Sequence, residues 1–94
     1  MQVAIVTGAS SGIGFGTAVK LSQTGMAIVG VGRDAGKLAA LEKVVNAPDR
    51  LATLAVDLTQ DDAPKKVVEL ALSRWGRIDF LINNAGVGSP KPLH

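Results

Sequence analysis

The sequence predicts an α/β domain with a doubly wound parallel sheet, here limited to about four strands and three helices. Four short apolar runs recur along the 94 residues, and segments with helical periodicity lie between them. The runs are continuous and do not alternate with polar residues, which is typical of strands covered by helices on both faces. A glycine-rich loop follows the first run directly and opens the first helical segment.

The four apolar runs are the predicted strands, which we expect over Val3–Val6, Ala27–Val31, Leu51–Val56 and Ile78–Ile82. Right-handed crossovers place the first two helices on one face of the sheet and the third on the other, because the strand order reverses between them. A single helix leaves much of the second face bare and apolar. We therefore expect the 94 residues alone to be partly unfolded and to self-associate.

Capping and breaking residues divide the chain into three helical segments. The third helix begins near Asp61 or Asp62, because Pro64 is tolerated only in a first turn. The other boundaries are Gly25 at the end of the first helix, Asp34 as the cap of the second, Asn46–Asp49 as its stop, and Gly76 at the end of the third. The apolar residues at helical spacing are predicted core: Leu38, Leu41, Val45, Val67, Leu70 and Trp75.

Composition excludes several classes of protein. The apolar fraction of 47% argues against disorder, and the net charge of +2 comes with no basic cluster beyond Lys65–Lys66, so no nucleic-acid partner is expected. There is no cysteine, and the one histidine is the last residue, so no metal site or triad is expected from these side chains. The uncharged first 19 residues lack a basic start and contain several glycines. We expect a cytoplasmic protein without signal peptide or membrane anchor.

The strongest feature is the loop between the first strand and the first helix. Gly8 lets the chain turn sharply out of the strand, Gly12 allows a pyrophosphate to approach the backbone, and Gly14 permits close packing of helix on sheet. The helix N-terminus would present free N–H groups to the phosphates. A Walker A phosphate loop does not fit, since Phe15 follows Gly14 where Lys is required. The predicted cofactor-binding residues here are Gly8, Ala9, Ser10, Ser11, Gly12, Ile13 and Gly14.

The Thr7-Gly8-xxx-Gly12-x-Gly14 spacing, together with the run Asn83-Asn84-Ala85-Gly86, resembles the short-chain dehydrogenase/reductase family over essentially the whole chain. The resemblance implies a Rossmann-type fold and a nicotinamide-dependent oxidoreductase acting on a carbonyl or alcohol. Residues 1–94 would be the N-terminal part of a single NAD(P)-binding domain. In a doubly wound sheet the first and fourth strands are neighbours, so both motifs reach the same crevice at the switch point.

The resemblance also implies roles for residues after the third and fourth strands. Asn84, Ala85 and Gly86 would lie beside the adenosine ribose, whereas Asn83 is taken as a supporting residue whose amide ties neighbouring strand ends. Asp57 would accept a hydrogen bond from the adenine amino group, with Leu58 beside the ring. The alternative for Asp57 is that it only caps the turn into the third helix.

Cofactor choice depends on the position after the second strand. An acidic residue there would bind the ribose 2′-hydroxyl of NAD, but this chain has Arg33, whose guanidinium can bind a 2′-phosphate. NADP(H) is therefore favoured over NAD(H). Two residues weaken this prediction: Ser11 stands where NADP-preferring relatives often carry a basic residue, and Asp34 adds a nearby negative charge. The alternative is that Arg33 is an ordinary exposed charge.

The chain has no tyrosine, while related enzymes use a Ser and a Tyr-xxx-Lys pair downstream of the Asn-Asn-Ala-Gly run. No catalytic residue is therefore assigned, and the 94 residues alone are expected to be inactive. We expect the N-terminal part of a longer enzyme, which would be a homo-oligomer. Two alternatives stay open: a stand-alone, noncatalytic dinucleotide-binding or sensing module, and a nonfunctional truncated product.

Overall fold

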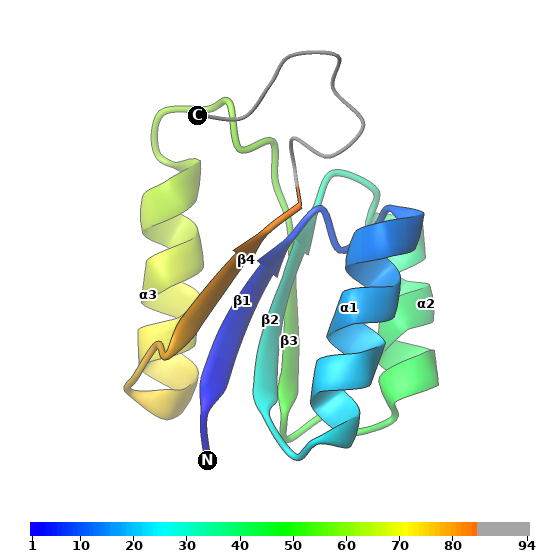
Figure 1. Ribbon diagram of the computed structural model, residues 1–94. Coiled ribbons are helices and arrows are strands. Elements are labelled where there is room, and N and C mark those ends of the chain that lie inside the picture. Colours follow the sequence, from blue (N-terminus) through cyan, green and yellow to red (C-terminus); the bar gives the residue numbers. More distant parts are fainter. Residues whose placement is uncertain (85–94) are drawn as a thin grey trace.

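The computed structural model describes residues 1–84. Figure 1 shows strands and helices alternating along the chain: β1 (Val3–Thr7), α1 (Gly12–Gln23), β2 (Ala27–Gly32), α2 (Ala35–Val45), β3 (Leu51–Ala55), α3 (Ala63–Trp75) and β4 (Phe80–Asn83). No helix in this described part is long and apolar enough to cross a bilayer.

The four strands form one parallel sheet in the order β3-β2-β1-β4. β1 is central, and its residue Ile5 stands opposite Val29 of β2 and Leu81 of β4. Helices α1 and α2 cover one face and α3 covers the other (Figure 1). The strand order reverses between β3 and β4, so the switch point lies between β1 and β4. The predicted doubly wound α/β fold is confirmed.

The core consists of two apolar layers, one on each face of the sheet. Ala18, Leu38 and Leu41 of the first two helices pack on one face, and Val67 and Ala71 of α3 pack on the other. The predicted core residues Leu38, Leu41 and Val67 are buried, while Val45, Leu70 and Trp75 are half-buried at the margins of these layers. Trp75 packs as predicted: its Nε1 donates to the Asp49 carbonyl oxygen at 3.4 Å.

The helix ends follow the capping residues. Asp34 is the N-cap of α2 and its Oδ1 accepts a hydrogen bond from the backbone N–H of Lys37 at 3.1 Å. Asp62 precedes α3, with Pro64 in the first turn. The three helices end before residues in the left-handed backbone region, namely Gly25 (φ +91°), Asn46 (φ +50°) and Gly76 (φ +72°).

The strand boundaries differ from the predicted runs by a residue or two. The largest difference is in β4, which begins at Phe80 and not at Ile78. Asp79 explains it, because its backbone N–H and its side chain both bind the backbone of Val3 and thereby fix where pairing with β1 starts. β3 ends at Ala55, although the next residue, Val56, still donates its backbone N–H to the Gly32 carbonyl oxygen at 2.9 Å before the turn at Asp57.

The two faces of the sheet are covered unequally, as predicted. Beside α3, an apolar hollow of about 160 Å³ opens between the helix and β4. Leu81 of β4 is 64% exposed, and Phe80 and Leu72 are nearly half exposed. Among the described strands β4 pairs only with β1, so its other edge is open. Self-association through this surface stays a prediction.

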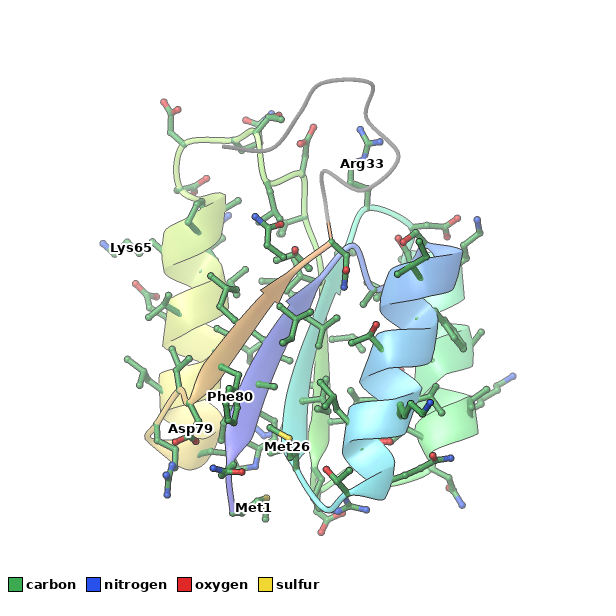
Figure 2. The ribbon with its side chains drawn as sticks, in the orientation of Figure 1. Met1, Met26, Arg33, Lys65, Asp79 and Phe80 are labelled. Carbon is green, nitrogen blue, oxygen red and sulfur yellow. The ribbon has the colours of Figure 1, made fainter. Side chains whose placement is uncertain are left out.

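Asp79 fastens β4 to the start of β1, at the end of the sheet opposite Arg33 (Figure 2). Its Oδ2 accepts the backbone N–H of Val3 and the Nε–H of Arg77, each at 2.8 Å, while Oδ1 accepts Arg77 Nη2 at 2.7 Å. The Arg77 hydrogen bond first, and the Val3 N–H second, lower the pKa of the Asp79 carboxyl.

We expect Asp79→Asn to lower the Tm near neutral pH and to flatten its decline in acid. Because the pKa of Asp79 is lower in the folded chain, its ionised form stabilises the fold above the unfolded pKa of about 4 and loses this contribution as pH falls through the folded pKa. Thermal melting from about pH 7 to pH 2 measures this. The exposed Asp61, changed to Asn, is the matched control. An acid limb for Asp79→Asn that runs parallel to the unsubstituted chain would contradict the assignment.

Candidate nucleotide-binding site

The loop from β1 to α1 is a tight turn closed on the carbonyl oxygen of Gly8. Gly8 has a φ of +64°, a backbone conformation that glycine adopts without steric cost. Its carbonyl oxygen accepts hydrogen bonds from the backbone N–H of Ser11 at 3.0 Å and from the Ser11 hydroxyl at 2.7 Å. The N–H of Ala9 donates to the Val31 carbonyl oxygen at 2.8 Å. The loop is thus anchored to β2 before α1 begins.

The glycines of this region meet different surroundings. A Cβ on Gly14 would overlap the Gly8 carbonyl group, and one on Gly32 would overlap the side chain of Ser10. A Cβ on Gly12, by contrast, would meet no described atom within 4 Å. Gly14 therefore lets the start of α1 lie directly against Gly8, and Gly32 lets Ser10 lie directly against β2. Gly12, by contrast, leaves open space above the loop. The sequence reasoning missed Gly32, although the pattern Gly30-Val31-Gly32 within a strand was a signal for close backbone approach.

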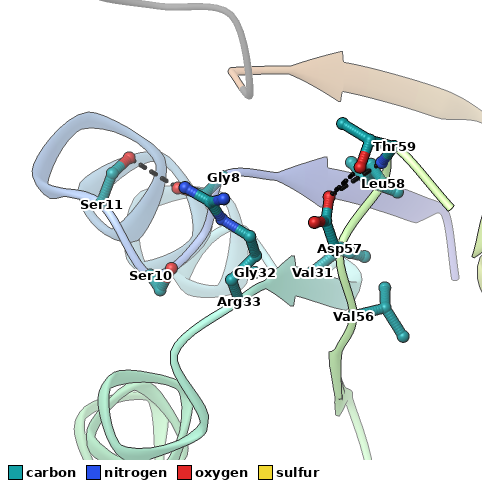
Figure 3. A pocket seen from close by; sticks show the side chains of 10 residues that line it. All are labelled: Gly8, Ser10, Ser11, Val31, Gly32, Arg33, Val56, Asp57, Leu58 and Thr59. Carbon is teal, nitrogen blue, oxygen red and sulfur yellow. Dashed lines mark hydrogen bonds between the residues drawn. The ribbon is translucent and has the colours of Figure 1, made fainter.

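A cavity of about 340 Å³ lies at the carboxyl ends of β1, β2 and β3 (Figure 3). Six predicted site residues line it: Gly8, Ser10, Ser11, Arg33, Asp57 and Leu58. The sequence reasoning did not single out the other four lining residues, which are Val31, Gly32, Val56 and Thr59. The cavity therefore joins the glycine loop to the two positions after β2 and β3 that the sequence placed beside a cofactor.

The remaining predicted loop residues lie around this cavity. Ala9 is buried beneath the loop, Gly14 is buried in the first turn of α1, and Ile13 is 60% exposed. Gly12 lines a second, adjoining cavity. Ala85 and Gly86 lie outside the described residues.

Asp57 shapes the turn that follows β3. Its Oδ1 accepts hydrogen bonds from the hydroxyl of Thr59 at 2.7 Å and from the Thr59 backbone N–H at 2.9 Å. These hydrogen bonds lower the pKa of Asp57, and the positive charge of Arg33 adds to the effect. Capping of the turn, which was the alternative for Asp57, is therefore present. It uses Oδ1, so Oδ2 remains available as an acceptor for a ligand.

Thr7, at the end of β1, holds the end of β4. Its hydroxyl donates to Oδ1 of Asn83 at 2.7 Å and accepts the backbone N–H of Asn84 at 3.0 Å. Asn83 thus ties neighbouring strand ends, as its supporting role required. The side-chain nitrogen of Asn84 is shielded from solvent and has no hydrogen-bond partner among the described residues. A buried amide donor without a partner is suited to an acceptor supplied by a ligand.

The polar groups around the cavity fit a dinucleotide. Within the described residues no side chain caps the first turn of α1, so its N–H groups are available to an anion. Open space lies above Gly12, and the exposed Arg33 lies in the cavity across from Asp57. The carboxylate of Asp34, which weakened the charge argument in the sequence, is engaged in capping α2.

The fold defines a Rossmann-type α/β domain, and comparison with known proteins identifies its family. Residues 2–94 match the short chain dehydrogenase family. An uncharacterized oxidoreductase of Listeria innocua is 40% identical over 93 residues, covering 98% of this chain and 38% of that protein. The chain therefore belongs to the short-chain dehydrogenase family, as the sequence motifs predicted, and it spans about two fifths of the length of this relative.

Solved structures agree with this membership. The crystal structure of a metagenomic short-chain oxidoreductase in complex with NADP is 44% identical, with a TM-score of 0.82 over 99% of this chain and 43% of that one. The apo form of glucose dehydrogenase from Caenorhabditis elegans is 30% identical, with a TM-score of 0.85 over 88% of this chain and 37% of that one.

We expect Gly14→Ala to destabilise the chain by about 1–3 kcal/mol, because the new methyl group would push the Gly8 carbonyl out of the turn. Gly16 is the matched control: it lies two residues further along the same helix, and a Cβ there would meet no atom within 4 Å. Gly16→Ala should stabilise by up to about 1 kcal/mol through helix propensity. Urea unfolding of both variants measures the difference. Equal changes in the free energy of unfolding for the two variants would show that the close approach of Gly14 to the Gly8 carbonyl does not require a glycine.

Proposed function

We propose that the chain provides the cofactor-binding half of an NADP-dependent oxidoreductase that acts on a carbonyl or alcohol. The observation that carries the proposal is the single cavity shared by the glycine loop, Arg33 and Asp57. Family membership supports the oxidoreductase class. The NADP bound to the similar metagenomic oxidoreductase supports the cofactor.

Residues in the cavity and around it have the following roles in this proposal. The N–H groups at the start of α1 bind the pyrophosphate, which approaches the backbone above Gly12. Oδ2 of Asp57 accepts a hydrogen bond from the adenine amino group, and Leu58 lies beside the ring. Asn84, with Ala85 and Gly86, borders the adenosine ribose. Arg33 binds the 2′-phosphate with charge-assisted hydrogen bonds. When bound, the nicotinamide supplies hydride transfer.

We propose that the proton chemistry uses a tyrosine, as the resemblance to related enzymes implies. The sequence has no tyrosine, so the acid–base residue would come from a further part of the polypeptide, and the chain alone would be inactive. The complete enzyme would be a cytoplasmic homo-oligomer. A noncatalytic dinucleotide-binding module is the second candidate, and the open space above Gly12 and the cavity favour it equally. Activity restored by adding the remaining polypeptide would separate the two.

Gly12→Val should abolish cofactor binding while leaving the fold intact. The valine side chain would fill the space above the loop, where no described atom lies within 4 Å, and would exclude the pyrophosphate. Calorimetric titration with NADP⁺ measures binding, and thermal melting measures folding. Gly16→Val places the same side chain elsewhere in α1 and should retain binding. A Gly12→Val variant that binds with unchanged affinity would refute the pyrophosphate assignment.

Arg33→Ala should weaken NADP⁺ binding by about 10- to 150-fold, the loss expected for a hydrogen bond to a charged group, and leave NAD⁺ binding nearly unchanged. Arg33→Lys keeps the charge but not the planar donor pair, so its loss should be smaller. Titration of both variants with both cofactors gives the preference directly. If the ratio of the two affinities stays the same in Arg33→Ala, the residue is an ordinary exposed charge.

A further inference from the structure

The outer edge of β3 is open. Among the described strands β3 pairs only with β2, so it forms the edge of the sheet on the side away from β4 (Figure 1). The carbonyl oxygen of Arg50 and the N–H of Val56 both bond to β2. Successive residues of a strand turn their backbone groups to alternate sides, so the residues whose N–H and carbonyl groups point away from β2 are Leu51, Thr53 and Ala55. They form a row of donors and acceptors that a further strand could use.

β3 lacks the features that usually protect an edge strand from pairing with another chain. Its sequence is Leu-Ala-Thr-Leu-Ala, which contains no proline and no charged side chain. Its register with β2 is continuous from Leu51 to Ala55, so no bulge turns the edge away. The backbone of β3 is therefore suited to accept another strand.

A cavity of about 350 Å³ opens beside the start of this edge. Residues of α2, of the loop before β3, of β3 itself and of α3 line it, namely Glu42, Pro48, Leu51 and Arg74. It shares no lining residue with the cavity that contains the glycine loop. It is thus a separate surface, and it has one acidic and one basic side chain.

These two charges approach the edge from opposite faces of the sheet, because α2 and α3 cover opposite faces. Oε2 of Glu42 accepts the hydroxyl of Thr53 at 3.0 Å. Nη2 of Arg74 donates to the Pro48 carbonyl oxygen at 3.1 Å, and its guanidinium lies 5.0 Å from the centre of the Trp75 ring. Neither Glu42 nor Arg74 takes part in an ion pair between described residues. The edge therefore presents a negative charge on one face and a positive charge on the other.

We propose that the β3 edge binds an extended peptide segment of a partner protein, which adds to the sheet as a further strand and carries a basic and an acidic side chain at adjacent positions. In this mode of recognition main-chain hydrogen bonds supply affinity and side chains supply specificity. Successive side chains of a strand point to opposite faces. The basic side chain would meet Glu42, and the adjacent acidic one would meet Arg74. This inference is independent of the proposed cofactor function.

A second copy of the chain fits this edge less well than such a segment. Two copies related by a two-fold axis would join their β3 edges antiparallel, with α2 of both copies on the same face of the extended sheet. Glu42 would then share a face with the Glu42 of the other copy, and Arg74 with its Arg74, so like charges would approach each other. β3 has no charged side chain that could compensate them. Charge complementarity therefore favours a different chain.

The first experiment is amide hydrogen exchange of the full 94-residue chain, followed by NMR with and without a synthetic peptide. The probe is acetyl-Thr-Val-Lys-Glu-Val-Thr-amide, which has the adjacent basic and acidic side chains. Binding should slow exchange at the outward-facing amides of Leu51, Thr53 and Ala55. The amides of Ala52 and Leu54 face β2 and should change little.

The second experiment measures affinity from the fluorescence of Trp75, the single tryptophan of the chain, which Arg74 overlies. Glu42→Gln should weaken binding of the probe about two- to fivefold, as expected for an exposed ion pair. Glu42→Lys should weaken it further, and a probe with glutamate in place of its lysine should bind this variant better than the unsubstituted chain. Glu69→Gln, in α3 and outside the cavity, is the matched control and should leave the affinity unchanged. Thermal melting shows that each variant folds.

Four results would overturn the inference. The first is unchanged exchange at the three outward-facing amides when the probe is added. The second is equal binding of a probe methylated at both valine nitrogens, one of which would face β3 in either register. The third is an affinity for both probes that Glu42→Lys does not alter. The fourth is protection of the outward-facing amides that increases with chain concentration in the absence of a probe, because this would assign the edge to a second copy.

Discussion

The carbonyl group of Gly8 is the point on which the rest of the site depends. It receives the backbone N–H and the hydroxyl of Ser11, and α1 starts directly against it because Gly14 has no side chain. A turn this tight brings the start of α1 to the end of β1. Ser10 reaches β2 because Gly32 has no side chain and leaves the space that the Ser10 side chain fills. The cavity follows from these two close approaches.

A single hydroxyl extends this arrangement to the other side of the switch point. Thr7 is the last residue of β1, and its hydroxyl is both donor and acceptor toward the two asparagines at the end of β4. These two hydrogen bonds join the ends of β1 and β4, which are neighbours in space and distant in sequence. The carboxyl ends of the strands are thereby aligned at one edge of the sheet, where parallel strands gather polar groups from separate βαβ units.

The sequence predicted the fold and the helix ends well because both rest on local chemistry. Continuous apolar runs, Asp34 as a cap and Pro64 in a first turn act on their own neighbourhood and can be read without a partner. The prediction of where β4 begins was wrong because Asp79 pairs with Val3, a residue at the other end of the chain. The pairing of the Thr7 hydroxyl with Asn83 was missed for the same reason, because it follows only from the arrangement of the strands. Gly32 was missed although the pattern Gly30-Val31-Gly32 was a local signal, and only its partner, Ser10, needed the folded structure. For the candidate site, sequence could name Arg33 and Asp57, but not that they share one cavity with the loop.

The link between Asp79 and Val3 has a consequence for the order of folding. It spans 76 residues, the longest separation among the contacts that hold the amino ends of the strands. Contacts of this kind close large loops, and they form late and slowly because the entropy of closure precedes the gain. On a ribosome, β1, β2 and β3 can pair while α3 is still being made. β1 would then remain unpaired on one side, and the switch point would be completed only when β4 pairs with it.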